Sequence, residues 1–339
     1  MKKILQNKNF QTVLLLVLTI IVLFFLLKDN FSQVVSELLK MNIWWILVTI
    51  LLIIGFWLFK SIGSNIIVQQ IKPDFKLKDS FKIGLVAQFF NSITPFALGG
   101  HPMQVHLFRK HKISITNGTN ITVQNFIVYQ IAVVIIQIIA IIIAFHTNLF
   151  GKNYIIRALV MGGLALDFFI IFILFVLGFS KKIKYVLINL GIKILTKLKV
   201  VKNQEETLDK WHNKIDNFHE CAKKLMASKK DFIKSILCNI IGLLALYLTP
   251  LTLLYATGDY TSFNAIQSIY ILACIIMAAD LVPTPGQIGG IEYGFSVLFG
   301  GFLTAPILSA IVIAYRFLSY YLALIIGGIA MNMKKKQSI

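Results

Sequence analysis

The sequence is poor in charged residues, and above all in acidic ones. Only 14% of its 339 residues are charged, and 14 acidic side chains accompany 33 lysines and arginines. A soluble domain carries roughly 25% charged residues, whereas this chain is 57% hydrophobic. The composition therefore excludes an ordinary soluble domain and predicts an integral membrane protein.

The chain also lacks the patterns of common catalytic and metal sites. Its three cysteines show no C-x-x-C spacing, and its six histidines form no H-E-x-x-H. Neither a Walker A element nor a G-x-S-x-G turn occurs. We therefore expect no enzyme activity, no catalytic residue, no metal and no cofactor.

Long apolar segments are abundant instead. A span needs roughly 20 apolar residues to cross about 30 Å of hydrocarbon. Six segments qualify, at residues 10–27, 42–68, 118–146, 155–179, 232–256 and 307–331. The first resembles a signal sequence, but no small-x-small cleavage site follows it, so we interpret it as a retained span.

Two further apolar stretches are interrupted in the middle. Residues 80–110 contain TPFALGGHP, residues 262–300 contain PTPGQIGG, and no half of either stretch is suited to crossing alone. We interpret both as re-entrant helical hairpins. The predicted fold is a single all-α polytopic membrane domain over 1–339, with about six transmembrane helices and two re-entrant hairpins.

The basic residues predict the orientation. With a cytoplasmic N-terminus, all but five of the 33 fall on the cytoplasmic side, where Lys60 is grouped with the lysines that follow the second span. The exceptions are Lys28, Lys40, Lys152, Arg157 and Arg316. The positive-inside rule accounts for this distribution, so the net charge of +19 requires no nucleic acid. Both termini are then cytoplasmic, and the two hairpins are inverted relative to each other.

The two interruptions share one motif. Residues 94–100 read TPFALGG and residues 284–290 read TPGQIGG, which both fit T-P-x-x-[L/I]-G-G. Paired breaks of this kind in two halves of a chain indicate a transporter binding site. We expect a first half at about 1–146 and a second at about 155–331, which includes a cytoplasmic loop at 180–231. A pair of structural kinks in ordinary spans is the alternative.

The chemistry of the breaks predicts an anion site. Proline removes a backbone donor, and Gly-Gly allows the chain to turn. Each helix that restarts after Gly-Gly is expected to offer free N–H groups and a positive dipole end, which favour a phosphate. The candidate substrate-binding residues here are Thr94, Gly99, Gly100, Thr284, Gly289 and Gly290.

Ionisable residues in apolar segments are the other candidates. Glu292 is expected to hold an amine, pair with Arg316 or exchange a proton, and Asp280 to bind substrate or cap a helix. Arg316 is expected to pair with Glu292 or Asp167, in a structural or a direct role.

The first hairpin carries histidines and basic residues, and no acid follows Ser80 up to Lys112. His101, and more weakly Arg109, are candidates for a lipid phosphate, although a basic cluster at a cytoplasmic edge also explains Arg109. Gln88, Asn91 and Gln104 are suited either to the same cavity or to interhelical hydrogen bonds.

The cytoplasmic loop contains one further pattern. Apolar residues alternate at spacings of three and four from Leu208 to Leu225, which predicts an amphipathic helix near 203–231. Its role stays open between packing on the membrane, on the core or on a partner.

Two stretches of the sequence resemble the transmembrane region of lysylphosphatidylglycerol synthases and the wider flippase-like family. They are PTPGQIGGIE, which follows Asp280, and NSITPFALGGHPMQ in the first half. In the full-length synthases this region moves aminoacylated phosphatidylglycerol between leaflets, and a separate C-terminal domain attaches the amino acid. Because this chain stops at Ile339, we expect that domain to be absent and a lysyltransferase name to hold by family only.

We therefore expect a flippase that moves a phospholipid or glycolipid headgroup through a midplane cavity formed by the two breaks, in a bacterial cytoplasmic membrane. Without an ATP motif, passive scrambling or ion coupling is implied. One alternative is a membrane subunit that presents lipid to a separate cytoplasmic transferase. Another is a non-transporting scaffold or lipid sensor, and a homo-oligomer stays open.

Overall fold

The computed structural model describes residues 31–179, 192–193, 196, 207–208 and 228–332. Within these ranges every regular element is a helix. The predicted first span at 10–27 and nearly all of the predicted amphipathic helix near 203–231 lie outside the described residues.

Five segments of the described chain are long and apolar enough to cross a membrane, and they match the other five predicted spans. They are α4 (Ile43–Gln69), α7 (Ile115–His146), α8 (Tyr154–Phe179), α11 with α12 (Lys229–Tyr247 and Thr249–Ala256), and α15 with η3 and α16 (Ala305–Arg316, Phe317–Tyr321 and Leu322–Asn332). The protein is an all-α polytopic membrane protein.

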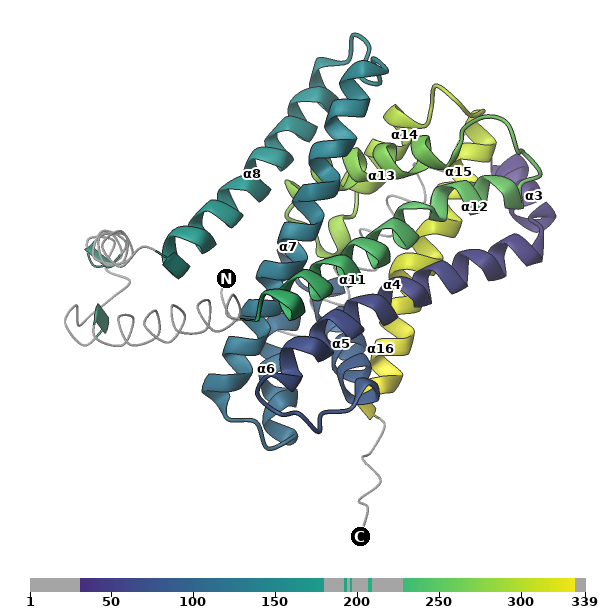
Figure 1. Cartoon of the computed structure of the whole chain (residues 1–339). Coiled ribbons are helices and arrows are strands. Elements are labelled where there is room, and N and C mark those ends of the chain that lie inside the picture. The colour runs from purple at the N-terminus through teal and green to yellow at the C-terminus, as the bar shows by residue number, and fades with distance from the viewer. Residues whose placement is uncertain (1–30, 180–191, 194–195, 197–206, 209–227, 333–339) are drawn as a thin grey trace.

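Both interrupted stretches form a helix, a one-turn break and a second helix. The first is α5 (Leu77–Ser92), η1 (Pro95–Ala97) and α6 (Gly100–Lys110). The second is α13 (Ala265–Asp280), η2 (Pro285–Gln287) and α14 (Gly290–Leu298). In Figure 1, α5 and α6 lie at the lower end of the molecule and α13 and α14 at the upper end, so the hairpins enter from opposite ends.

The core is built around α13, which packs against α7, α8, α11, α12 and α14. Ile271, Leu272, Ala273, Cys274 and Ile275 are all fully buried, so every face of this part of the helix is covered. A capping box fixes the start of the helix, because Asn264 and Gln267 exchange side-chain-to-backbone hydrogen bonds. The short helix α3 (Phe31–Lys40) packs against α15.

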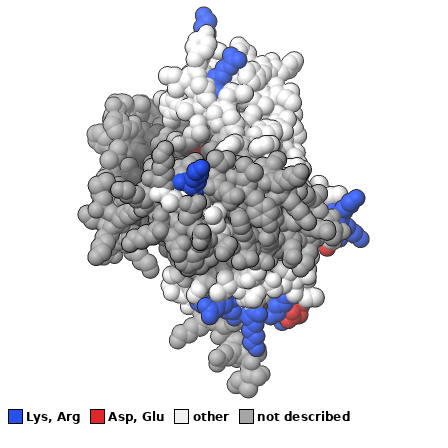
Figure 2. Space-filling view, turned by 90° about the vertical axis from the view of Figure 1, so that its left-hand side faces the viewer, with Lys and Arg blue, Asp and Glu red and all other residues white. Residues whose placement is uncertain are grey.

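The described basic residues lie at several heights of the molecule. Figure 2 shows lysines and arginines gathered at the lower end, others at the upper end, and further ones at mid-height, including a group at the right-hand edge. In Figure 1 the α4–α5 and α6–α7 connections, with the exposed Lys76 and Lys112, lie at the lower end, and the α7–α8 connection, with the exposed Lys152, lies at the upper end. The orientation in the membrane stays a prediction.

Close packing of α8 on α13 depends on Gly163. A Cβ atom there would lie 1.9 Å from the backbone oxygen of Met277. We expect Gly163→Ala to lower the free energy of unfolding by about 1–3 kcal/mol, measured by thermal unfolding in detergent. Gly55→Ala in α4 is the matched control, since its Cβ meets nothing within 4 Å, and it should leave stability unchanged or slightly raised. Equal effects of the two changes would contradict this packing.

Candidate functional site

The two breaks have the same backbone conformation over the first four residues of their shared motif. Thr94 and Thr284 are extended, and the third position has φ 54° and ψ 20° at Phe96 and φ 62° and ψ 18° at Gly286. The fourth position is also left-handed in both, with φ 52° at Ala97 and 56° at Gln287. The sequence match is therefore a structural match, and the two breaks diverge only afterwards.

Side chains of the first hairpin satisfy the first donors of the restarting helix α6. The Gly99 N–H donates to Thr94 Oγ1 at 2.9 Å, and the Gly100 N–H donates to Asn91 Oδ1 at 2.7 Å. The expectation that these glycines offer free donors is wrong, because nearby polar side chains already fill them. Both glycines are needed for this fit, since a Cβ at Gly99 would lie 2.6 Å from Thr94 Cγ2 and one at Gly100 would lie 2.4 Å from Asn91 Oδ1.

The second break is held by an ion pair. Arg316 Nε donates to Glu292 Oε1 at 2.6 Å and Nη2 donates to Oε2 at 2.8 Å, and both side chains are buried. Glu292 Oε2 also accepts the Gly289 N–H at 2.7 Å, so this helix N-terminus has no free donor at that position either. Of the two partners predicted for Arg316, the structure selects Glu292.

The same guanidinium fixes the turn itself. Arg316 Nη1 donates to the Gly286 carbonyl at 2.8 Å and Nη2 to the Gln287 carbonyl at 3.1 Å. A helical break leaves backbone carbonyls without partners, which is costly at membrane depth. Arg316 satisfies two of them, so the ion pair braces the second break.

The two breaks meet. η1 packs against η2, and α5 also contacts η2. Tyr320, in the π-helical turn η3, touches both: its hydroxyl donates to the Ser92 carbonyl at 2.9 Å, and its ring lies where a Cβ of Gly286 would be. Thr284 Oγ1 closes the second turn by donating to the Ile288 carbonyl at 2.8 Å, and Gly290 packs against Ala279.

The two remaining acidic candidates bind amides. Asp167, in α8, accepts hydrogen bonds from Gln130 and Gln137 of α7, each at 2.6 Å. Asp280, at the end of α13, accepts one from the Gln287 side chain in the second break. Neither lies within salt-bridge distance of a basic side chain in the described part of the chain.

The two basic candidates of the first hairpin lie apart from each other. His101 packs edge-on against Phe126 of α7, with the ring centroids 5.2 Å apart. Arg109 is exposed in the last turn of α6. The structure therefore does not bring Arg109 to either break.

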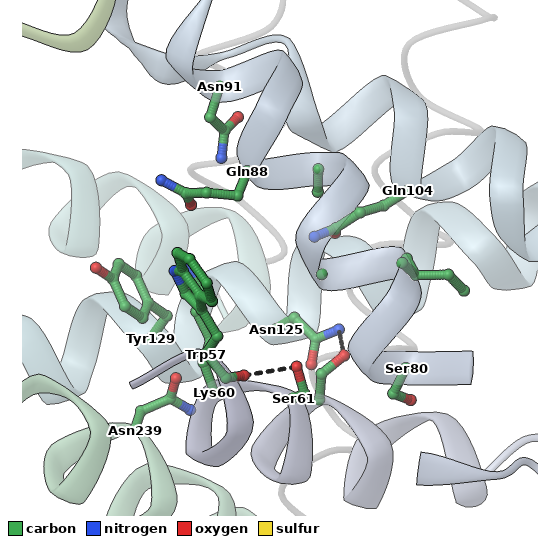
Figure 3. A pocket seen from close by; sticks show the side chains of 14 residues that line it. Trp57, Lys60, Ser61, Ser80, Gln88, Asn91, Gln104, Asn125, Tyr129 and Asn239 are labelled. Atoms are coloured by element: carbon green, nitrogen blue, oxygen red, sulfur yellow. Dashed lines mark hydrogen bonds between the residues drawn. The ribbon is translucent and has the colours of Figure 1, made fainter. Parts of the chain in front are cut away.

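A cavity of about 60 Å³ lies beside the first hairpin, between it and three of the spans. Figure 3 shows its side chains converging from α4, α5, α6, α7 and α11. The polar ones are Lys60, Ser61, Ser64, Ser80, Gln88, Asn91, Gln104, Asn125, Tyr129 and Asn239. Gln88, Asn91 and Gln104 thus line a common cavity, although His101 is not part of its wall.

Lys60 is the cation of this cavity, and sequence reasoning misplaced it. It lies inside α4, about 14 Å along the helix from Gln69, rather than in a cytoplasmic loop. Its Nζ lies 4.2 Å from the ring centroid of Tyr129 and 5.5 Å from that of Phe56. No carboxylate of the described residues lies within salt-bridge distance of it.

Comparison with known proteins identifies the family. The family model of the lysylphosphatidylglycerol synthase TM region matches residues 12–327, which include both hairpins, the first four described spans and most of the fifth. The chain belongs to this family.

Two relatives of similar length are named as UPF0104 membrane proteins. One from Archaeoglobus fulgidus is 24% identical over 334 residues, which cover 90% of this chain and 91% of the relative. Another, from Methanocaldococcus jannaschii, is 24% identical over 345 residues, covering 96% of this chain and 95% of the relative. The lysylphosphatidylglycerol synthase TM family is a membrane-domain family, which agrees with a multi-pass membrane protein.

One signal in the sequence was available for Lys60. It stands inside the predicted span 42–68, where an ionisable residue is a functional candidate by default. When Lys60 is counted with the cytoplasmic lysines at 72–82, its position inside the span is not taken into account. In this member of the lysylphosphatidylglycerol synthase TM family, the cavity around Lys60 and the paired breaks together form the candidate site.

Proposed function

We propose that the protein moves the phosphate-bearing headgroup of a phospholipid or glycolipid between the two leaflets of a membrane. The observation that carries the proposal is Lys60, a cation without an acidic partner among the described residues, in a polar cavity beside a broken hairpin. An intramembrane cation without a counter-ion is costly, and an anionic ligand would offset that cost.

The meeting of the breaks supports the same proposal. Broken helices in two inverted halves are the elements around which transporters rock or gate. Here η1 and η2 touch, and the cavity lies along α5 and α6, which flank η1. The headgroup would occupy the cavity while the acyl chains remain in lipid.

Transport by the full chain in proteoliposomes tests the proposal. Phosphatidylglycerol with a fluorescent acyl chain is placed in both leaflets, and dithionite bleaches only the label it can reach. We expect bleaching of the inner-leaflet label with protein and none without it. Protein-containing vesicles that behave like empty ones would refute the proposal for this lipid, and a labelled glycolipid extends the same test.

Lys60→Gln should slow this transport by roughly tenfold or more, since a charge-assisted contact is worth about 1.5–3 kcal/mol. The bleaching rate per reconstituted protein measures the effect. Lys152→Gln, an exposed lysine in the α7–α8 connection, is the matched control and should keep the normal rate. Equal rates for both variants would remove the Lys60 cavity from the transport path.

A further inference from the structure

Several polar side chains of the cavity form no hydrogen bond or ion pair with another described residue, and three of them come from α4, α5 and α6. Lys60 of α4, Gln88 of α5 and Gln104 of α6 form no side-chain hydrogen bond or ion pair with another described residue. Gln104 Oε1 is also shut off from solvent. In Figure 3, Gln88 lies above Trp57 and Tyr129, and Gln104 lies on the other side of the same space.

Other amides of the wall are already satisfied. Asn125 donates to Ser64 Oγ at 2.8 Å, Asn239 donates to the Ser235 carbonyl at 2.8 Å, and Asn91 accepts the Gly100 N–H. Gln88 and Gln104 are half-buried, and the Gln104 Oε1 atom is fully buried. Polar groups withdrawn from solvent are nearly always hydrogen-bonded, so unpaired amides at a cavity point to a ligand. The groups without a hydrogen bond or ion pair thus include one cation and two neutral amides, and the hydroxyl of Tyr129 on α7 joins them.

The charges of the wall determine which ligands are excluded. No acidic side chain lines the cavity, and Lys60 would repel an ammonium group. Asp167 and Asp280 lie near enough to Tyr129 to interact with it electrostatically, but both are already held by glutamine amides. An amine that entered the cavity would therefore meet a like charge and no free carboxylate.

The amides determine which ligands are favoured. An amide offers a carbonyl that accepts and an NH₂ that donates, and a hydroxyl group can pair with either end. A phosphate ester with neighbouring hydroxyls would thus pair with Lys60, with Gln88 and with the NH₂ end of Gln104 together. The volume of about 60 Å³ corresponds to roughly four waters, which suits a phosphate or a small polyol fragment.

We infer that this cavity is a binding site for a hydroxylated phosphate ester, such as a glycerol phosphate or sugar phosphate group, and that it selects against amine-bearing headgroups. The inference rests on the proposed function where the ester belongs to a lipid. The same chemistry also occurs in soluble esters, so the source is a separate arm of the test.

Binding of soluble probes to the full chain in phosphatidylcholine nanodiscs tests this directly. The probes are glycerol 3-phosphate, propyl phosphate, which has the same carbon skeleton without hydroxyls, and phosphoethanolamine. We expect glycerol 3-phosphate to bind at least about fivefold tighter than propyl phosphate, since one net hydrogen bond is worth about 1 kcal/mol. Phosphoethanolamine should bind more weakly than either.

Variants then assign the preference to the cavity. Gln104→Leu should abolish the difference between glycerol 3-phosphate and propyl phosphate while leaving propyl phosphate binding intact, and Gln88→Leu provides the same test if that variant does not fold. Lys60→Gln should weaken both esters by about the same factor. Lys152→Gln should change neither.

The outcomes separate this inference from the proposed function. Equal binding of propyl and glycerol phosphates, or tighter binding of phosphoethanolamine, would overturn the inference even if lipid transport is observed. Selective binding without any transport would support the inference and refute the proposed function. Displacement of glycerol 3-phosphate by phosphatidylglycerol added to the nanodisc would identify the ligand as a lipid headgroup, and a lack of displacement would identify it as a soluble ester of the same class.

Discussion

Replacing Arg316 with alanine is expected to lower the free energy of unfolding by about 3–5 kcal/mol, because it leaves the Glu292 carboxylate buried without its counter-ion. It also removes the donors to the Gly286 and Gln287 carbonyls, which hold the second break. Thermal unfolding in detergent, followed by circular dichroism, measures the loss. This is the largest stability effect we expect from a single charged residue in the described chain.

Two further variants make the Arg316 prediction specific. Arg157→Ala removes an exposed arginine that lies 5.0 Å from the ring centroid of Phe145, and it should cost no more than about 1 kcal/mol. The double variant Arg316→Ala with Glu292→Ala should cost less than the sum of the two single changes, because neither charge is then left alone. An Arg316→Ala protein as stable as Arg157→Ala would show that the ion pair does not brace the break.

Substitutions at the third position of the repeated motif are expected to change stability in opposite directions in the two breaks. At Gly286, a new side chain would combine a left-handed backbone with a Cβ atom 2.1 Å from the Tyr320 ring. We expect Gly286→Val to cost roughly 2–5 kcal/mol, from overpacking and backbone strain together. At Phe96 the backbone is already left-handed and the side chain is 54% exposed, so Phe96→Gly relieves strain and loses little burial. It should raise stability by up to about 1 kcal/mol.

The same detergent unfolding measurement serves both changes. Each variant is the control of the other, because Phe96 and Gly286 occupy the same motif position with similar backbone angles, φ 54° and 62° and ψ 20° and 18°. Equal destabilisation by both changes would indicate that the two turns do not share the conformation described for them.

The architecture was accessible from the sequence because its determinants are local. Length and hydrophobicity define the five described spans, and proline with Gly-Gly marks both breaks. The sequence predicts either Glu292 or Asp167 as the partner of Arg316. Only the three-dimensional path of α15 shows that the partner is Glu292.

The occupied donors at the two helix N-termini depend on side-chain contacts in three dimensions, which a sequence pattern does not contain. The sequence predicts that the restarting helices offer free donors to an anion. In the structure Thr94 and Asn91 accept the N–H groups of Gly99 and Gly100. Glu292 accepts the N–H of Gly289. Whether a short polar side chain turns toward its own backbone is set by rotamer and packing. Lys60 is misplaced for a different reason: when lysines are counted for the positive-inside rule, one inside a span is easily added to those that follow the span.

The two breaks are built alike but held by unequal means. The second is held by charge-assisted hydrogen bonds from Arg316 and is largely inside the molecule, whereas the first is held by neutral hydrogen bonds from Thr94 and Asn91 and exposes Pro95, Phe96, Ala97 and Leu98. Because neutral hydrogen bonds are weaker than charge-assisted ones, the first break is expected to deform at a lower free-energy cost than the second. A movement that opens the cavity beside Lys60 is therefore expected at the first hairpin, while the second hairpin, which Tyr320 joins to the first, keeps its shape.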